Sequence, residues 1–87
     1  MHRFKELEIW KKSRVFCNEI YEVTAQFPDT EKFGLTNQLR RASVSIPSNI
    51  AEGASRKSNK DFSRFLEIAL GSCYEIETQL LISETRF

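Results

Sequence analysis

The chain has 87 residues, with 13 Lys and Arg side chains against 12 Asp and Glu side chains and a formal net charge of +1 at pH 7. This length bounds it to one small domain, residues 1–87, with limited ability to bury apolar surface unless it oligomerises. No apolar run approaches the roughly 20 residues of a membrane span, and the charged N-terminus is unlike a signal region. We therefore expect a soluble cytoplasmic protein with no membrane partner.

The first predicted helix covers about residues 5–27. Apolar and small residues recur there at alternating spacings of four and three, which is typical of an amphipathic helix. Its predicted core line is Ile9, Ser13, Phe16, Ile20, Val23 and Phe27. Pro28 and the polar residues after it predict a stop and a turn.

The second predicted helix covers residues 35–53 and contains an interior proline, Pro47, which costs a helix roughly 3 kcal/mol. Gly53 is expected to end it, because glycine adopts the left-handed conformation without a side-chain clash. The predicted core line is Leu35, Leu39, Ala42, Ile46 and Ile50. A smaller apolar flank on another side is a candidate oligomer interface and consists of Val44, Pro47 and Ala51.

The third predicted helix covers residues 59–86 and begins after Ser58, whose hydroxyl is expected to cap a backbone amide three residues on, at Asp61. A coiled-coil-like seam follows at spacings of four and three: Phe62, Leu66, Ala69, Cys73, Ile76 and Leu80. Glu77 and Glu84 fall inside this face, where they either reach solvent at a frayed end or meet basic groups of a neighbouring helix. Together the elements predict an all-α, antiparallel up-down bundle of three helices.

The sequence offers no catalytic, cofactor-binding or metal-binding set, and we expect a protein that is not an enzyme. Cys17 and Cys73 have no CxxC spacing, and His2, which we expect to be frayed, is the single histidine. We interpret both cysteines as buried core thiols rather than as a disulfide or a reactive nucleophile.

The Asn49 amide is expected to bond to a neighbouring helix or to the carbonyl freed by Pro47.

Several blocks of residues carry a resemblance to a known family. They are Trp10-Lys11-Lys12, Phe27-Pro28, Phe33-Gly34-Leu35-Thr36, the run from Gln38 to Gly53, Arg56-Lys57-Ser58, and the blocks from Phe65 to Ser72 and from Glu77 to Leu80. In this order they resemble the four-helix-bundle family of proteins encoded in intervening sequences of bacterial 23S ribosomal RNA genes. The longest block contains Ser-Ile-Pro-Ser-Asn-Ile-Ala-Glu-Gly, and the resemblance covers nearly the whole chain.

This resemblance implies a homo-oligomer, in related members a pentameric ring, and a role in nucleic-acid transactions. Related accessory proteins of diversity-generating retroelements are basic and bind nucleic acid together with a reverse transcriptase. The family brings no catalytic residues. Because the sequence stops where the family would turn into a fourth helix, we expect either a truncated chain or a bundle completed by another subunit. The wide apolar stripes of the first and third helices then predict an exposed groove in an isolated monomer.

The middle of the chain is its most basic part. Residues 39–64 carry six basic and two acidic side chains, whereas residues 65–87 carry one and four. The candidate nucleic-acid-binding residues are Arg56, Lys57, Lys60 and Arg64, which would bind phosphates of RNA or DNA without sequence preference. The alternatives are that these residues form an ordinary solvated face, and that the protein is a scaffold or adaptor whose oligomer binds a protein partner.

Arg40 and Arg41 precede this basic segment. They either extend the basic surface or pair with Glu52, Glu75 or Glu77, inside the bundle or across subunits. We expect structural pairing.

Overall fold

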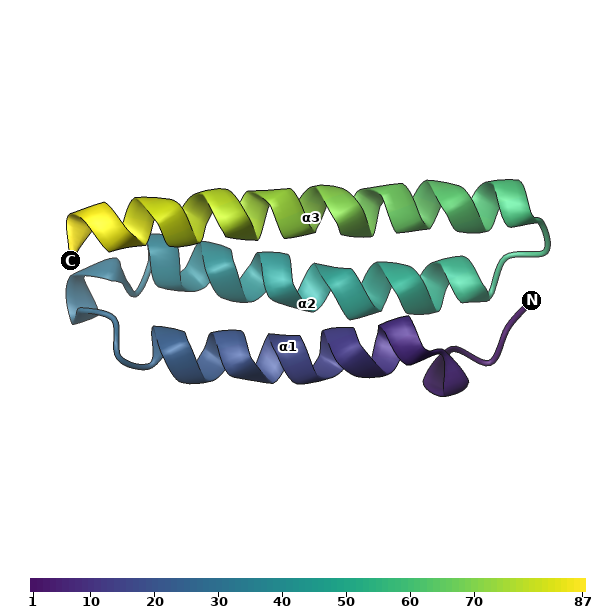
Figure 1. The fold of residues 1–87 in the computed structure, drawn as a ribbon, viewed down its shortest axis with the longest axis horizontal. Coiled ribbons are helices and arrows are strands. Elements are labelled where there is room, and N and C mark those ends of the chain that lie inside the picture. The colour runs from purple at the N-terminus through teal and green to yellow at the C-terminus, as the bar shows by residue number, and fades with distance from the viewer.

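The computed structural model describes residues 1–87 as an elongated set of three helices (Figure 1). The helices are α1 (Glu8–Thr24), α2 (Leu35–Ala54) and α3 (Asn59–Arg86), and short 3-10 turns at Phe4–Glu6 and Asp29–Glu31 precede α1 and α2. Neighbouring helices run antiparallel, and α2 lies between the other two. This confirms the predicted all-α up-down bundle of three helices. None of the helices is long and apolar enough to cross a membrane.

The first helix is shorter than the expected range of 5–27. Leu7 is extended, with φ −74° and ψ 127°, and separates the 3-10 turn Phe4–Glu6 from α1. At the other end, the Phe27 amide donates to the Thr24 carbonyl at 3.1 Å, a three-residue step that tightens the chain into a turn. The apolar pattern continues through these flanking residues, so periodicity alone placed them in the helix.

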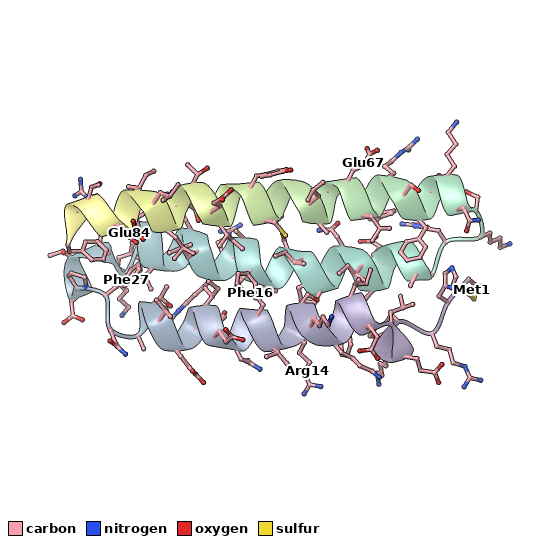
Figure 2. All side chains as sticks on the ribbon, in the orientation of Figure 1. Met1, Arg14, Phe16, Phe27, Glu67 and Glu84 are labelled. Atoms are coloured by element: carbon pink, nitrogen blue, oxygen red, sulfur yellow. The ribbon has the colours of Figure 1, made fainter.

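The core is built around α2, and the predicted core line is correct for four of its five residues; Leu35, the first residue of α2, is only half-buried. Leu39, Ala42, Ile46 and Ile50 are all buried, and α2 continues through Pro47. From the flanking helices, Ile20 of α1 and both Ala69 and Ile76 of α3 pack into the same cluster. The side chain of Phe16 in α1 and that of Phe27 in the turn after α1 point toward the other helices, while Arg14 of α1 points away (Figure 2).

The outer helices do not pack on each other. Both contact α2, but no Cα atom of α1 lies within 8 Å of a Cα atom of α3. As a result Ile9 and Val23, which were expected in the core line of the first helix, are each 48% exposed. The expectation was wrong for these two residues because no helix lies opposite that side of α1.

Gly53 has a different role from the expected helix stop. Helix α2 continues to Ala54, and no glycine in the chain has a positive φ angle. Instead Gly53 is buried where α2 meets α3, and a methyl group placed on it would lie 2.8 Å from Phe65 Cβ and 2.9 Å from Phe62 Cδ1. The glycine is therefore needed for close helix packing.

Polar contacts hold the helix ends. Ser58 Oγ accepts a hydrogen bond from the Asp61 amide at 3.1 Å, as predicted for the start of α3. At the start of α2, Glu31 Oε1 accepts from the Leu35 amide at 3.1 Å. The other carboxylate oxygen of Glu31 lies 3.5 Å from Arg86 Nε, which ties the end of α3 to this turn.

Asn49 bonds within its own helix. Its Nδ2 donates to the Ser45 carbonyl, one turn back, at 2.7 Å. Pro47 frees the carbonyl of Ser43, because an α-helical amide bonds to the residue four positions before it. The two predicted partners of the Asn49 amide, a neighbouring helix and the carbonyl freed by Pro47, were therefore both wrong.

Candidate functional site

The four candidate nucleic-acid-binding residues lie together and are all exposed. They are Arg56 and Lys57 in the α2–α3 connection and Lys60 and Arg64 in the first turns of α3, one helical turn apart. Arg56 Nη2 lies 3.1 Å from Glu52 Oε1. Lys57, Lys60 and Arg64 have no carboxylate within 4.0 Å, so their charges remain available to an anion.

The position of Arg56 is fixed by a second contact. Its guanidinium carbon lies 4.8 Å from the centroid of the Phe65 ring, a distance at which a cation is attracted to the ring face. Since Arg56 also pairs with Glu52, it is the one member of the four whose charge is partly used inside the protein. The other three are the stronger candidates for phosphate contacts.

The N-terminus joins this group of cations. The His2 amide donates to the Ala54 carbonyl at 2.8 Å, and the His2 ring lies 5.1 Å from the ring of Phe62. His2 was expected to be frayed, and it is instead held at the end of α2. Figure 2 shows Met1 at this end of the molecule and Glu84 at the opposite end. No periodic pattern could have found this contact, because His2 precedes the first helix.

We call this end of the molecule the basic end: the α-amine of Met1, together with Arg3, Arg56, Lys57, Lys60 and Arg64. Arg3 lies 3.6 Å from Glu6, but both side chains are largely exposed, so this pair contributes little and leaves the arginine accessible. The prediction from the sequence found four of these groups and missed the two that the folded N-terminus brings.

Charge is unevenly distributed along the whole molecule. Contacts of Cys17 with Ser43 and of Ser45 with Ser72 mark its middle. The half that contains the basic end, residues 1–15 and 46–72, has nine basic and five acidic side chains, a net charge of +4. The other half, residues 16–45 and 73–87, has four basic and seven acidic side chains, a net charge of −3.

Arg40 and Arg41 do not form the expected ion pairs within the chain. Arg40 Nε donates to Thr24 Oγ1 at 2.9 Å, and its guanidinium carbon lies 4.7 Å from the Tyr21 ring centroid. Arg40 thus joins α2 to α1. Arg41 is exposed with no carboxylate within 4.0 Å. Glu52 lies eleven residues further along the same helix, about three turns away, and pairs with Arg56 instead.

The predicted oligomer interface lies on the α1 side of α2. Val44 is 42% exposed and borders a shallow cleft with Tyr21 and Arg41. Pro47 and Ala51 are half-buried. The flank therefore offers one accessible apolar side chain, and its role in assembly stays a prediction.

A larger apolar surface lies in the groove between α1 and α3, which we call the α1/α3 groove. It encloses about 400 Å³, and α2 forms its floor. Its lining residues are Ile9, Lys12, Ser13 and Phe16 of α1, Ile46 and Ile50 of α2, and Leu66, Ala69, Leu70 and Cys73 of α3. The structure thus shows the exposed groove that the apolar stripes predicted.

The two cysteines differ from the expected pair of buried core thiols. Cys73 is exposed and lines the α1/α3 groove, because α3 has no helix opposite it there. Cys17 is half-buried between α1 and α2, with its Sγ 3.4 Å from Ser43 Oγ. Both thiols are free.

Glu77 and Glu84 continue the line of Cys73 along α3, at spacings of four and seven. Both are exposed, and neither has a basic group within 4.0 Å. Of the two interpretations left open, the structure shows the solvent-facing one within a single chain.

A polar cleft lies on the other side of the α2–α3 pair. Gln79 Nε2 donates to Gln38 Oε1 at 3.2 Å, while Gln79 Oε1 is buried without a hydrogen-bond partner. The cleft encloses about 450 Å³, and Arg41 and Glu75 contribute opposite charges to its lining. No group of three or more His, Cys, Asp or Glu side chains is placed to hold a metal ion.

No curated protein matches the chain. The family of 23S rRNA-intervening sequence proteins matches residues 5–86, which include all three α-helices and the basic segment. The chain therefore belongs to the 23S rRNA-intervening sequence protein family.

Proposed function

We propose that this protein is a non-enzymatic, self-assembling helical module that binds the phosphate backbone of RNA or DNA through its basic end. The observation that carries the proposal is the group of three unpaired, exposed cations Lys57, Lys60 and Arg64 at one end of a molecule whose other half is acidic. Cations of this kind bind the phosphate groups of a nucleic acid and release its counterions, and they do not distinguish one base sequence from another.

Self-assembly is supported by the α1/α3 groove. An apolar groove on a small domain is a liability in water unless another surface covers it. An oligomer would also repeat the basic end, and several weak phosphate-binding ends on one particle bind a polymer more tightly than one end does. The two parts of the proposal therefore reinforce each other.

The experiment measures binding to a labelled single-stranded RNA and to a labelled duplex DNA by fluorescence anisotropy across a salt series. Four duplex phosphate contacts predict a slope of log K against log salt concentration of about −3.6. In the triple variant Lys57→Gln, Lys60→Gln, Arg64→Gln, the slope should flatten by about 2.7 because three contacts are lost.

A matched control removes the same number of charges away from the basic end. Lys11, Arg14 and Lys32 are exposed and lie outside it, so Lys11→Gln, Arg14→Gln, Lys32→Gln should keep the slope of the parent protein. Absence of binding at low salt, or equal loss in both triple variants, rejects the nucleic-acid part of the proposal.

A second candidate function is that of a scaffold or adaptor whose oligomer binds a protein partner. It is favoured by the same groove, because apolar grooves between helices accept amphipathic helices of other proteins. Assembly in solution together with no affinity for either nucleic acid would favour this function over the first.

A further inference from the structure

We infer that the basic end selects single strands of nucleic acid over duplexes, because it presents two planar side chains, His2 and Arg56, on which unpaired bases stack. This inference deepens the proposed function and rests on it. The phosphate contacts supply the attraction, and the two planar groups supply a preference that charge alone does not give.

Two aromatic rings of α3 form the base of this surface. Phe62 and Phe65 lie three residues apart, so their side chains are neighbours on one side of the helix. Both pack against Gly53 of α2: a methyl group placed there would lie 2.9 Å from Phe62 Cδ1 and 2.8 Å from Phe65 Cβ. Both side chains are half-buried, so the contact between α2 and α3 holds the two rings in place.

A planar group lies on each ring. The centroid of the His2 ring is 5.1 Å from that of Phe62, and the two rings are inclined by 44°. The guanidinium carbon of Arg56 lies 4.8 Å from the centroid of the Phe65 ring. These distances are typical of aromatic and cation–π contacts, so the phenylalanine rings orient both groups. The bond from the His2 amide to the Ala54 carbonyl brings the N-terminus beside the α2–α3 connection (Figure 1).

Both planar groups also remain accessible from outside. His2 is exposed, and the Arg56 side chain is 44% exposed. The ion pair with Glu52 uses Nη2, at the edge of the guanidinium plane, and leaves the face turned away from Phe65 uncovered. Aromatic rings and guanidinium planes are the groups on which proteins stack the bases of single strands.

Cations for the phosphates surround the two planar groups. Lys57, Lys60 and Arg64 are exposed, with no carboxylate within 4.0 Å. A single strand can therefore place bases on His2 and Arg56 while its phosphates contact these cations. In a duplex the faces of each base are covered by the neighbouring base pairs, so only the phosphates are available.

The direction of the preference separates stacking from charge. A duplex has a higher charge density than a single strand and releases more counterions for each phosphate contact. Contacts with phosphates alone therefore favour the duplex. Tighter binding of the single strand requires contacts with the bases.

The first test measures dissociation constants at one salt concentration by fluorescence anisotropy. The ligands are a labelled RNA of about 12 nucleotides that does not pair with itself, the DNA strand of the same sequence, and the duplex of that DNA strand. Two stacked bases, each contributing about fivefold, predict that the parent protein binds the single strands about 20-fold more tightly than the duplex. The two single strands should bind alike, because stacking does not use the 2′-OH.

Two substitutions remove the planar groups without removing other contacts. His2→Ala keeps the backbone amide that bonds to Ala54, and Arg56→Lys keeps the positive charge. Each variant should lower the ratio of single-strand to duplex affinity by about fivefold, and the double variant should lose the preference. A double variant that keeps the ratio of the parent protein overturns the inference.

The matched control is Arg14→Lys. The guanidinium carbon of Arg14 lies 5.8 Å from the centroid of the Trp10 ring, so this variant also replaces an arginine that lies over an aromatic ring. Arg14 is exposed and lies outside the basic end, and the ratio should stay at the parent value. Far-UV circular dichroism verifies that all variants keep their helices.

The second test observes His2 directly by proton NMR. His2 is the single histidine of the chain, so its imidazole protons give one set of signals. A base stacked on the ring shifts these signals upfield through its ring current. The shift is expected with the single strands and not with the duplex, and signals that stay in place when the protein is saturated with single strand overturn the inference.

The outcomes separate this inference from the proposed function. A parent protein that binds the duplex as tightly as the single strands, or that prefers only one of the two single strands, overturns the inference and leaves phosphate binding standing. A parent protein that binds none of the three ligands at low salt overturns both.

Discussion

The backbone of Gly53 in α2 lies directly against the side chain of Phe65 in α3. A methyl group at Gly53 would come within 2.8 Å of Phe65 Cβ, closer than nonbonded carbon atoms approach. The same methyl group would also lie 2.9 Å from Phe62 Cδ1, so it would meet two aromatic side chains of α3 at once. This packing brings the C-terminal end of α2 close to the first turns of α3 and so sets the position of the basic end.

The substitution Gly53→Ala should lower the free energy of unfolding by about 1–3 kcal/mol, because the added methyl group forces the two helices apart. Urea denaturation followed by circular dichroism measures this change. Gly71→Ala is the matched control: Gly71 lies inside α3, and a methyl group there would meet nothing within 4 Å. That variant should gain about 0.5–1 kcal/mol, as expected for alanine in a helix interior. Equal effects of the two substitutions would contradict the packing role of Gly53.

The cap at the start of α3 gives a second prediction. Ser58→Ala removes the acceptor of the Asp61 amide, and the free energy of unfolding should fall by about 1 kcal/mol. Ser63→Ala, at an exposed position inside the same helix, should change it by less than about 0.5 kcal/mol. Urea midpoints of the two variants decide the matter, and a midpoint for Ser58→Ala at the parent value would show that water replaces the cap.

The contact between Arg40 and Thr24 gives a third prediction. Arg40→Met should lower the free energy of unfolding by about 1–3 kcal/mol, since a charge-assisted hydrogen bond to a buried hydroxyl and the contact with the Tyr21 ring are both lost. The neighbouring variant Arg41→Met serves as the control, because Arg41 is exposed and forms no ion pair. Thermal and urea unfolding should leave Arg41→Met within about 0.5 kcal/mol of the parent. A larger loss for Arg41→Met than for Arg40→Met would show that the contact with α1 is unimportant.

Much of the fold follows from local pattern. The core line Leu39, Ala42, Ile46 and Ile50 could be predicted because α2 is covered on two sides, so that its apolar stripe and its buried stripe coincide. The cap at Ser58 could be predicted because it depends on residues three positions apart.

The remaining features depend on contacts between distant segments. Nothing near Gly53 in the sequence indicates that Phe65 will pack on it, and a glycine near a helix end fits a left-handed stop equally well. The partner of Arg40 is a threonine rather than one of the expected carboxylates, which a search for opposite charges overlooks. Ile9 is exposed because no helix lies across the groove from it. The spacing of apolar residues shows which side of a helix is apolar, but not whether another helix covers that side.

The candidate site likewise combines residues that are close in sequence with residues that only the fold brings together. The four cations from Arg56 to Arg64 are close in sequence and could be found there, whereas Met1 and Arg3 reach them only because His2 bonds to Ala54. The sequence therefore predicts fewer positive charges at the basic end than the folded protein has there.

The separation of +4 and −3 into opposite halves of a molecule 44 Å long makes the protein an electric dipole along its long axis. In the field of a polyanion such a particle experiences a torque before any contact forms, and the end that carries Lys57 and Lys60 turns toward the strand. A larger share of collisions then begins end-on. The net charge of +1 thus understates how strongly a polyanion would attract the basic end, because an oriented molecule presents its positive half first.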